Sequence, residues 1–422
     1  MTTLSTDLAG LVRELAAAPV RDHDRYVARL RLADTAFATF VGSRTGPGRL
    51  GVQVADELHG ARSLAGRAFR LVAAGRLTEI DDIDLLSCVT PGAIVVPTVL
   101  ALVGGPGKIR VDVDGVLDAV VRGYEVALGL GEAIRGPQRL ATGVWPSLTV
   151  GGVTAAAVAA WLLGAADDEV AAAVHLAARQ SIAGNPRGNA REILLAGAVV
   201  TGICCAVAAR RGFAISGGAG VVDDLLDASA EVSGSARIHR PSIKPICSAR
   251  QTMGAVSALR SVLDTGEVTL DDIGRIDVHV PTEYAAMLDK PAVASRRESL
   301  SSAQYQLALA AVDPAGLYDV DRAVLRTDEA FRALMARVHV HPDADLSAQY
   351  PVRWPARVRV TVTGGTVEAV TDDVPGEHDI SAETLATKLR AFGASPDLVE
   401  RALSVTDVSD LHQLDISKES LA

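Results

Sequence analysis

Apolar residues recur every three or four positions from Leu8 to about Ala230, a spacing that predicts a long series of helices. Around Arg275 the spacing changes to strict alternation in RIDVHV, and the alternation returns in RVHVHP and in ARVRVTVTGGTVEAV. These stretches predict strands, the last of them folded into a hairpin at Gly364–Gly365. After Ile380 the segment SAETLATKLRAF returns to a helical pattern.

The change of spacing predicts two domains. With 422 residues the chain is longer than a single hydrophobic core usually supports. We expect a large all-helical domain over residues 1–268, a smaller α/β domain over residues 269–379, and a return of residues 380–422 to the helical domain. The predicted fold class is therefore mainly α with a second, α/β domain, and a ligand is expected in a cleft between the two.

The composition favours closely packed helices in a protein that does not enter a membrane. Hydrophobic residues make up 49% of the sequence and aromatic residues only 4%, so the apolar volume comes from Ala, Val and Leu. Two segments, Val150–Ala165 and Ile193–Ala208, are nearly uncharged, but both are shorter than the roughly 20 apolar residues that span a bilayer. We expect both to be buried helices.

Charge and cysteine usage exclude several classes of partner. The formal net charge of −10 would repel a nucleic-acid backbone, and the N-terminus lacks the basic start and apolar block of a secretory signal. His339 and His341 share one face of a predicted strand, but no third ligand accompanies them, so no metal site is expected. The cysteines have no zinc-site spacing and are expected to be reduced thiols of a cytoplasmic protein: Cys88, Cys204, Cys205 and Cys247.

Three carboxylates stand close together before a TPG turn and an apolar helix. Asp81, Asp82 and Asp84 lie within RLTEIDDIDLLSCVTPGAIVVPTVL. Crowded carboxylates repel one another, and the repulsion raises at least one pKa towards neutrality, where the carboxyl group can act as a general acid or base. The alternative interpretation is ordinary: acidic residues often stand, solvated, near helix starts.

Cations gather on an irregular stretch, RIHRPSIKPICSARQTM, that contains two prolines. Clustered cations on a loop suit an anionic ligand, and a helix that begins near Ser248 would point free backbone N–H groups at the same place. The alternative is a solvated loop. The cations are His239, Arg240, Lys244 and Arg250.

Two further features allow a functional and a structural interpretation. Arg187 and Arg191 stand on the Gly/Asn-rich stretch GNPRGNARE, where they could hold a second carboxylate or simply be solvated. Tyr305 lies on the apolar helix SSAQYQLALA, where its phenol could donate a proton or could make one hydrogen bond in a core.

Five stretches follow one another between about residue 8 and residue 310: LRLADTAFATFVG, RLTEIDDIDLLSCVTPGAIVVPTVLAL, GVWPSLTVGGVTAAAVAAWLLG, IKPICSARQTMGAVSAL and SSAQYQLALA. In this order they resemble the landmarks of the MmgE/PrpD family, which includes 2-methylcitrate dehydratase and cis-aconitate decarboxylase. The paired aspartates before the TPG turn and the KPxxC…R stretch are the most specific of them.

The resemblance implies a cytoplasmic homodimer in which each subunit has a large helical domain and a smaller, lid-like α+β domain, with the active site between them. Known activities of the family are dehydration, decarboxylation and epimerisation of small carboxylates without a metal or organic cofactor. We therefore expect a small carboxylate substrate and no cofactor.

The resemblance also assigns site residues and shows where this chain departs from the family pattern. The family's aspartate pair falls on Asp81 and Asp82, its lysine on Lys244 and its late tyrosine on Tyr305. Arg191 and Glu192 stand where many members place a lysine. Better-known members have histidine at four positions where this chain has other residues: Asp84, Thr90, Trp145 and Met253.

The sequence as a whole predicts a lyase, specifically a dehydratase, that removes a proton alpha to a carboxyl or carbonyl group and expels a beta-hydroxyl group as water. Trp145 in place of histidine predicts a substrate that is bulkier or less charged than methylcitrate. The alternatives are an isomerase or epimerase, a decarboxylase, or a dimeric binding protein without activity. The predicted catalytic residues are Asp81, Asp82, Asp84, Lys244 and Tyr305, and the predicted substrate-binding residues are Thr90, Trp145, Arg187, Arg191, Arg250 and Gln251.

Overall fold

The computed structural model describes residues 7–60, 62–103, 111–184, 190–215, 220–227, 229–230, 232, 234, 236–372, 374 and 380–404. The chain forms two compact units. The helical unit consists of Met1–Ile243 with His378–Ala422, and the sheet unit consists of Lys244–Glu377.

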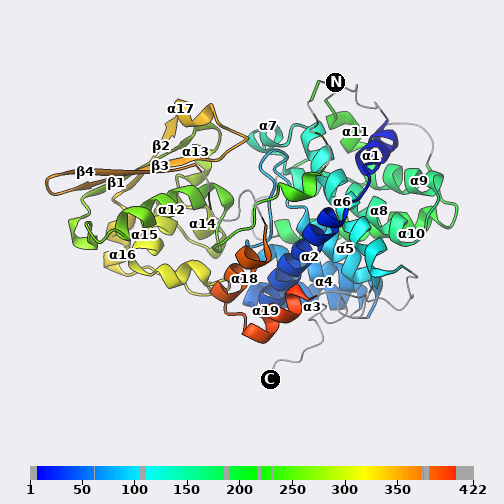
Figure 1. The fold of residues 1–422 in the computed structure, drawn as a ribbon, viewed down its shortest axis with the longest axis horizontal. Coiled ribbons are helices and arrows are strands. Elements are labelled where there is room, and N and C mark those ends of the chain that lie inside the picture. The colour runs from blue at the N-terminus through cyan, green and yellow to red at the C-terminus, as the bar shows by residue number, and fades with distance from the viewer. Residues whose placement is uncertain are drawn as a thin grey trace. The chain divides into compact units, whose positions relative to one another are not determined.

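The first boundary between the units lies before helix α12 (Arg250–Leu263), whereas the sequence interpretation placed it after this helix, at residue 268. The reason is that α12 packs against strands β3 (Ala356–Val362) and β4 (Gly365–Thr371) and against helix α15 (Ala303–Val312) of the sheet unit. At the other end, α18 (Ala382–Ala391) and α19 (Pro396–Leu403) lie in the helical unit beside α2 (Asp22–Ser43), as Figure 1 shows in red beside blue.

The helical unit is built around two apolar helices, α5 (Gly92–Val103) and α8 (Pro146–Leu162). All residues of α5 and nearly all of α8 are buried, because neither helix has a polar face. Small residues bring α8 close to its neighbour α10: a Cβ atom on Gly202 would lie 2.2 Å from the carbonyl oxygen of Gly152. The other helices of this unit are α1 (Leu8–Ala16), α3 (Gly46–His59), α4 (Leu64–Leu77), α6 (Val113–Ala133), α7 (Gly136–Ala141), α9 (Asp167–Ala178), α10 (Arg191–Ala209) and α11 (Val221–Leu225).

One helix of the described residues, α10, is long and apolar enough to cross a membrane by length and composition. About half of it is buried inside the helical unit, where it packs against α4, α8 and α9. The buried part of α10 needs no polar face, because it lies in the core of the unit.

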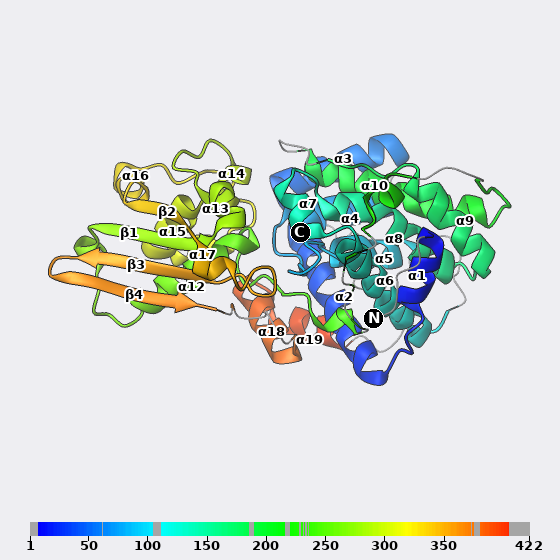
Figure 2. The same ribbon diagram turned by 90° about the horizontal axis from the view of Figure 1, so that it is seen from above.

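The sheet unit contains four strands in the order β2-β1-β3-β4, visible side by side in Figure 2. Strands β1 (Arg275–Pro281) and β2 (Val338–Asp343) are parallel, and the other neighbours are antiparallel. Strands β3 (Ala356–Val362) and β4 (Gly365–Thr371) form the predicted hairpin, in which Gly364 has a φ of +104° that favours glycine.

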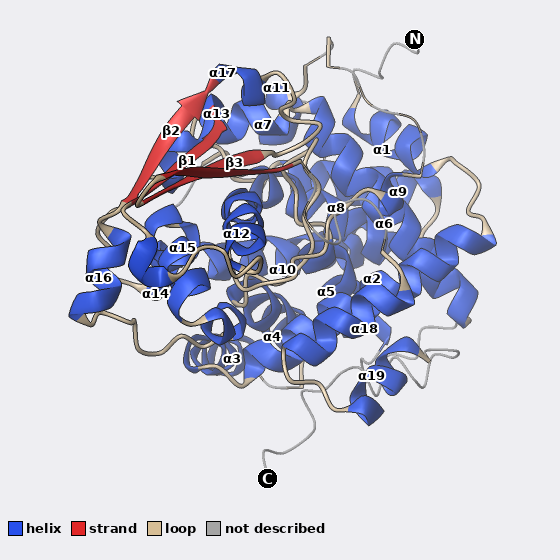
Figure 3. Ribbon diagram, turned by 60° about the vertical axis from the view of Figure 1, so that its left-hand side comes forward, coloured by secondary structure: helices blue, strands red, loops and turns tan. Residues whose placement is uncertain are grey.

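Helices cover one face of this sheet. The residues of β1 and β3 that alternate inwards are buried, and α12 and α15 (Ala303–Val312) pack on that side (Figure 3). A helical unit together with a unit of helices on a mixed sheet confirms the predicted fold class. The remaining helices of the sheet unit are α13 (Thr282–Leu288), α14 (Arg296–Ser301), α16 (Glu329–Met335) and α17 (Ala344–Ser347).

Candidate active site

The predicted acidic stretch is a buried loop of the helical unit. We call residues 78–91, between α4 and α5, the acidic loop, and its carboxylates Glu79, Asp81, Asp82 and Asp84 the acidic cluster. Asp81, Asp82 and Asp84 are at most 1% exposed. The interpretation of solvated helix caps therefore does not describe them, although one of the three does contact the start of a helix.

The path of the loop is fixed by its backbone. Glu79 and Cys88 adopt left-handed conformations with φ values of +58° and +53°. Ile83 pairs with Ser242, whose amide donates to the Ile83 carbonyl at 2.8 Å, and Asp84 pairs with Val89. These pairings hold the acidic loop against the chain just before Lys244 and turn its aspartates inwards.

Asp82 is held by two donors. The backbone N–H of Gly92, at the start of α5, donates to its Oδ1 at 2.8 Å, and the phenol of Tyr124 on α6 donates to its Oδ2 at 2.8 Å. The guanidinium of Arg31 lies 3.8 Å from the same Oδ2. Only glycine fits at position 92, because an added Cβ would lie 2.6 Å from Asp82 Oδ1 and 2.4 Å from Thr35 Oγ1.

Burial makes Asp82 a weak acid. Removal from water raises its pKa to about 6, because the charged form loses its hydration. Arg31 and the two donors oppose this rise, whereas the neighbouring carboxylate of Asp34 adds to it. Burial and the charge of Asp82 also raise the pKa of Tyr124 well above its usual value, so the phenol keeps its proton. A carboxyl group with such a pKa exchanges a proton readily near neutral pH.

Asp84 lies in a second polar pocket of the loop. Its Oδ2 accepts from the backbone N–H of Ser87 at 2.9 Å and from the Ser87 hydroxyl at 2.7 Å, and Arg240 contacts it at 3.2 Å. Burial raises the pKa of Asp84, and Arg240 and Ser87 oppose the rise. Arg240 also pairs with Glu132 of α6. Arg240 is one of the cations predicted on the irregular stretch RIHRPSIKPICSARQTM, and it contacts the acidic cluster within the helical unit.

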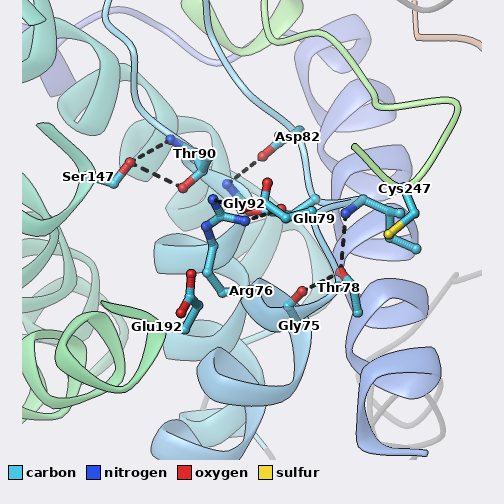
Figure 4. A network of polar contacts seen from close by, with 12 residues as sticks. Gly75, Arg76, Thr78, Glu79, Asp82, Thr90, Gly92, Ser147, Glu192 and Cys247 are labelled. Carbon is cyan, nitrogen blue, oxygen red and sulfur yellow. Dashed lines mark hydrogen bonds and ion pairs between the residues drawn. The ribbon is translucent and has the colours of Figure 1, made fainter. Parts of the chain in front are cut away.

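Asp81 and Glu79 share Arg76, the penultimate residue of α4. The Arg76 guanidinium donates to Asp81 Oδ1 at 2.9 Å and to Glu79 Oε1 at 2.8 Å, and Figure 4 shows it beside Glu192. Burial alone would lower the pKa of Arg76, but the charges of Asp81, Glu79 and Glu192 outweigh it and raise the pKa. The guanidinium is therefore permanently charged.

Arg191, a predicted substrate-binding residue, extends the same network. Its guanidinium contacts Glu79 at 3.0 Å and Glu192 at 3.2 Å, and it stacks on the ring of Trp145 with 4.4 Å to the ring centroid. Trp145 is the N-cap residue directly before α8 and is 4% exposed. Both predicted residues thus lie beside the acidic cluster, but the charge of Arg191 is balanced by two carboxylates.

Thr90 lies at the end of the loop, two residues before Gly92. Its backbone N–H donates to the hydroxyl of Ser147 at 3.0 Å, and the two hydroxyl groups lie 3.2 Å apart (Figure 4). By the resemblance, Thr90 stands where better-known members have a histidine, and its hydroxyl group cannot act as a base near neutral pH. Its role in substrate binding stays a prediction.

A lysine from the end of the chain supports the loop. The ammonium group of Lys388, on α18, donates to the carboxylate of Asp34 and to the carbonyl oxygen of Ile80. The side chains of Lys388 and Asp34 are 2% and 0% exposed. The ion pair fixes the backbone directly before Asp81 and places a negative charge near Asp82.

The remaining predicted residues lie in the sheet unit, apart from Arg187, which lies outside the described residues. Lys244, Arg250 and Gln251 are buried, and Arg250 begins α12, two residues after the predicted start. Tyr305 is 2% exposed on α15, and its hydroxyl accepts from the backbone N–H of Arg326 at 3.0 Å. These surroundings match the core tyrosine of the alternative interpretation, and its catalytic role stays a prediction.

The sequence interpretation missed several members of the site. For Arg31 in RLRLAD and Tyr124 in VVRGYEV, the signal is a polar side chain among the apolar positions of a helical stretch. A buried polar group needs a hydrogen-bond or ion-pair partner. Such a residue therefore predicts a polar contact, but the sequence does not show which residue is the partner. The missed residues are Arg31, Asp34, Arg76, Glu79, Tyr124, Ser147 and Lys388.

Within the described part of the chain, no group of three or more His, Cys, Asp or Glu side chains is arranged to hold a metal ion. His339 and His341 lie on β2, and His341 contacts Asp277 of β1 at 2.6 Å. The acidic cluster is instead surrounded by cations and hydroxyl groups, an arrangement that suits proton transfer.

Comparison with known families agrees with this description. The family model for the MmgE/PrpD N-terminal domain matches residues 6–219, and the model for the MmgE/PrpD C-terminal domain matches residues 247–408. No curated protein matches the sequence. The N-terminal match includes the whole acidic loop, and the family includes dehydratases and related enzymes. The chain belongs to the MmgE/PrpD family.

Proposed function

We propose that the protein is a lyase, specifically a dehydratase of a small hydroxy-carboxylate or related carbonyl compound that is not methylcitrate itself. The observation that carries the proposal is the buried acidic cluster, in which Asp82 has a pKa of about 6 and is held by Tyr124 and Gly92. Membership of a family that includes dehydratases supports the same scaffold.

In the proposed reaction a carboxylate of the cluster, Asp82 or Asp84, takes the proton alpha to the substrate's carboxyl or carbonyl group. The electron pair of that C–H bond becomes an enolate and then the new C=C bond, as the bond to the beta-hydroxyl breaks. The leaving hydroxyl takes a proton from a neighbouring carboxyl group and departs as water. Preorganised cations stabilise the developing charge, each commonly worth about 3–4 kcal/mol.

Arg240 is the cation of the helical unit best suited to that task. It contacts Asp84 and is about a quarter exposed, so it can meet a ligand without leaving its carboxylate partners. The resemblance gives Lys244 the corresponding role, with Arg250 and Gln251 as further binding residues. Trp145, in place of a family histidine, makes the wall of the site larger and less polar.

The test is mass spectrometry of the protein incubated in deuterated water with a panel of beta-hydroxy acids, dicarboxylates and tricarboxylates. We expect loss of water from one class of substrate, and we expect the loss to disappear in Asp82→Asn and Lys244→Ala. Asp271→Asn, which changes an exposed aspartate of the sheet unit, is the matched control and should retain activity. Efficient turnover of methylcitrate or cis-aconitate would contradict the proposed substrate class.

The same measurement separates the competing reactions. An isomerase or epimerase would incorporate deuterium without losing water, and a decarboxylase would release carbon dioxide. A binding protein without activity is favoured by one observation, that each carboxylate of the acidic cluster already contacts a cation or a donor. Unchanged, undeuterated compounds throughout would support that alternative.

We further propose a cytoplasmic homodimer. The described residues leave apolar side chains exposed on two helices of the helical unit, α3 with Leu50 and Leu58 and α10 with Leu194 and Val207. Apolar side chains that stay exposed on the surface are a feature of protein interfaces. Light scattering after gel filtration should give twice the mass of one chain, and Leu194→Arg with Leu58→Arg should give the monomer.

A further inference from the structure

A cavity of about 240 Å³ lies in the helical unit among α1, α6, α8 and α9, which pack together at one end of that unit (Figure 1). We call it the arginine pocket, because Arg13 of α1 and Arg122 of α6 line it together with Trp161 and Asp167. None of its lining residues belongs to the acidic cluster. The arginine pocket is therefore a separate feature of the fold.

Arg13 and Arg122 both line the arginine pocket, Arg13 as an exposed and Arg122 as a half-buried residue. No hydrogen bond or ion pair joins the side chain of Arg13 or Arg122 to another described residue, and the Nε of Arg122 is shielded from solvent. Glu125, three residues after Arg122 on α6, pairs with Arg237 at 2.9 Å. One turn before Arg122 on the same helix lies Asp118. Its carboxylate is taken by Arg25, which holds it with two contacts of 2.7 and 3.2 Å.

Because the Nε of Arg122 is shielded, an anion in the pocket would accept from the outer Nη groups of Arg122 and Arg13, neither of which has a protein acceptor among the described residues. A guanidinium group is suited to a planar carboxylate, which accepts two parallel N–H bonds from it. The third charge of the pocket, Asp167, limits the formal charge of the lining to +1. A polyanion would be repelled by Asp167, so the charge balance favours a monoanion.

The rest of the arginine pocket is apolar. Trp161, Val12 and Val170 line it, and Trp161 is partly exposed, whereas the other two tryptophans, Trp145 and Trp354, are 4% and 2% exposed. An indole face beside valine side chains suits a flat or branched apolar group. The volume is sufficient for a ligand of about ten heavy atoms rather than for a nucleotide.

We propose that the arginine pocket binds a small organic monocarboxylate, with the carboxylate against Arg122 and Arg13 and the apolar body against Trp161. The site is independent of the proposed lyase reaction, because it shares no residue with the acidic cluster. Trp161 gives a direct readout, since it is the partly exposed tryptophan of the three.

The experiment is a titration of the full chain with phenylacetate, followed by tryptophan fluorescence and by calorimetry. We expect saturable binding that changes the fluorescence, and Trp161→Phe should remove the fluorescence change. Arg122→Gln should weaken binding by about tenfold or more, as expected for the loss of a charge-assisted pair. Arg211→Gln, an exposed arginine outside the pocket, should bind as the unchanged protein does.

Two further ligands test the proposal with the unchanged protein. Phenylacetamide has the same shape as phenylacetate but no charge, and it should bind about tenfold more weakly. Inorganic phosphate should not compete, because it lacks the apolar body. Equal affinity in Arg122→Gln, loss of binding in Asp82→Asn instead, or no saturation by phenylacetate or 3-methylbutanoate at millimolar concentrations would each overturn the proposal.

Discussion

Two carboxylates, Asp82 of the acidic cluster and Asp277 on the open face of the sheet, have opposite properties, although both stand beside cations. Asp277 on β1 is bound by Arg275, its pKa is lowered to about 2, and His341 adds to the effect while burial opposes it. Asp82 has its own arginine, Arg31, yet its pKa is raised to about 6. The difference lies in how far each carboxylate is removed from water. For Asp277, the interaction with Arg275 lowers the pKa more than the slight burial raises it. For Asp82, burial raises the pKa more than Arg31 lowers it.

The comparison separates a structural charge from a group suited to proton transfer. A carboxyl group that is always ionised at neutral pH cannot give up a proton there, whereas one with a pKa of about 6 can take a proton and return it. The cations near Asp82 are therefore expected to hold the site in place, and the burial sets its chemistry.

The largest contrast is expected in activity. Asp82→Asn keeps the shape of the side chain but removes the base, and we expect kcat to fall by about 10²–10⁴. Asp277→Asn, the matched change on the sheet, should leave kcat unchanged. The measurement is steady-state turnover of the substrate found by mass spectrometry, with circular dichroism as a control for folding. Equal losses in the two variants would show that the acidic cluster has no special role.

The next contrast concerns ion pairs. Lys388→Met should lower the free energy of unfolding by about 3–5 kcal/mol, because it leaves the buried carboxylate of Asp34 without its cation. Arg359→Met breaks the pair with Glu368, whose side chains are 46% and 42% exposed, and should cost at most about 1 kcal/mol. Urea titration of both variants measures the difference.

A third contrast is the dependence of stability on pH. Between its ordinary value of 3.8 and about 6, Asp82 holds its proton in the folded chain but not in the unfolded one, so the free energy of unfolding falls as pH rises through that window. The shift corresponds to about 3 kcal/mol. Asp277 acts in the opposite direction: its stabilisation is present above pH 3.8 and is lost as pH falls towards 2.

Urea titrations across pH measure these two slopes. Asp82→Asn should remove the fall in the free energy of unfolding between pH 4 and pH 6. Asp277→Asn should remove only the loss of stability that occurs as pH falls below 3.8. An unchanged slope between pH 4 and pH 6 in Asp82→Asn would mean that another group titrates there.

The smallest contrast lies within the acidic cluster. Tyr124→Phe removes one hydrogen bond to Asp82 and should cost about 1–2 kcal/mol of stability. Because that hydrogen bond favours the charged carboxylate, its loss should raise the pKa of Asp82 further. The acid limb of the pH–rate profile should then move to higher pH. A loss of stability without movement of the profile would make Tyr124 a packing residue only.

The fold could be predicted because spacing alone identifies helices and strands. The change of period near Arg275 and the hairpin at Gly364–Gly365 both have local causes, and the structure contains both. The boundary near residue 268 could not be predicted in the same way. The sequence of α12 is helical like that of the first unit, and only its packing on β3 and β4 shows where it belongs.

The site could be predicted in part, for the same reason. The aspartates are neighbours along the chain, so the amino-acid sequence alone predicts that they are crowded. Their partners come from distant segments, Arg31 from α2, Tyr124 from α6 and Lys388 from α18, and no local pattern predicts that these side chains meet. Burial also could not be predicted locally, because acidic residues before a helix are usually solvated.

The most direct test of the central claim is a carbon-13 NMR titration of the aspartate side-chain carboxyl groups, with Asp82→Asn for assignment. We predict one carboxyl resonance that titrates with a pKa of about 6 and is missing in the variant, beside a group near 2 that is missing in Asp277→Asn. If the resonance removed by Asp82→Asn titrates at or below the ordinary value of 3.8, Asp82 is a structural charge and the account of this site is wrong.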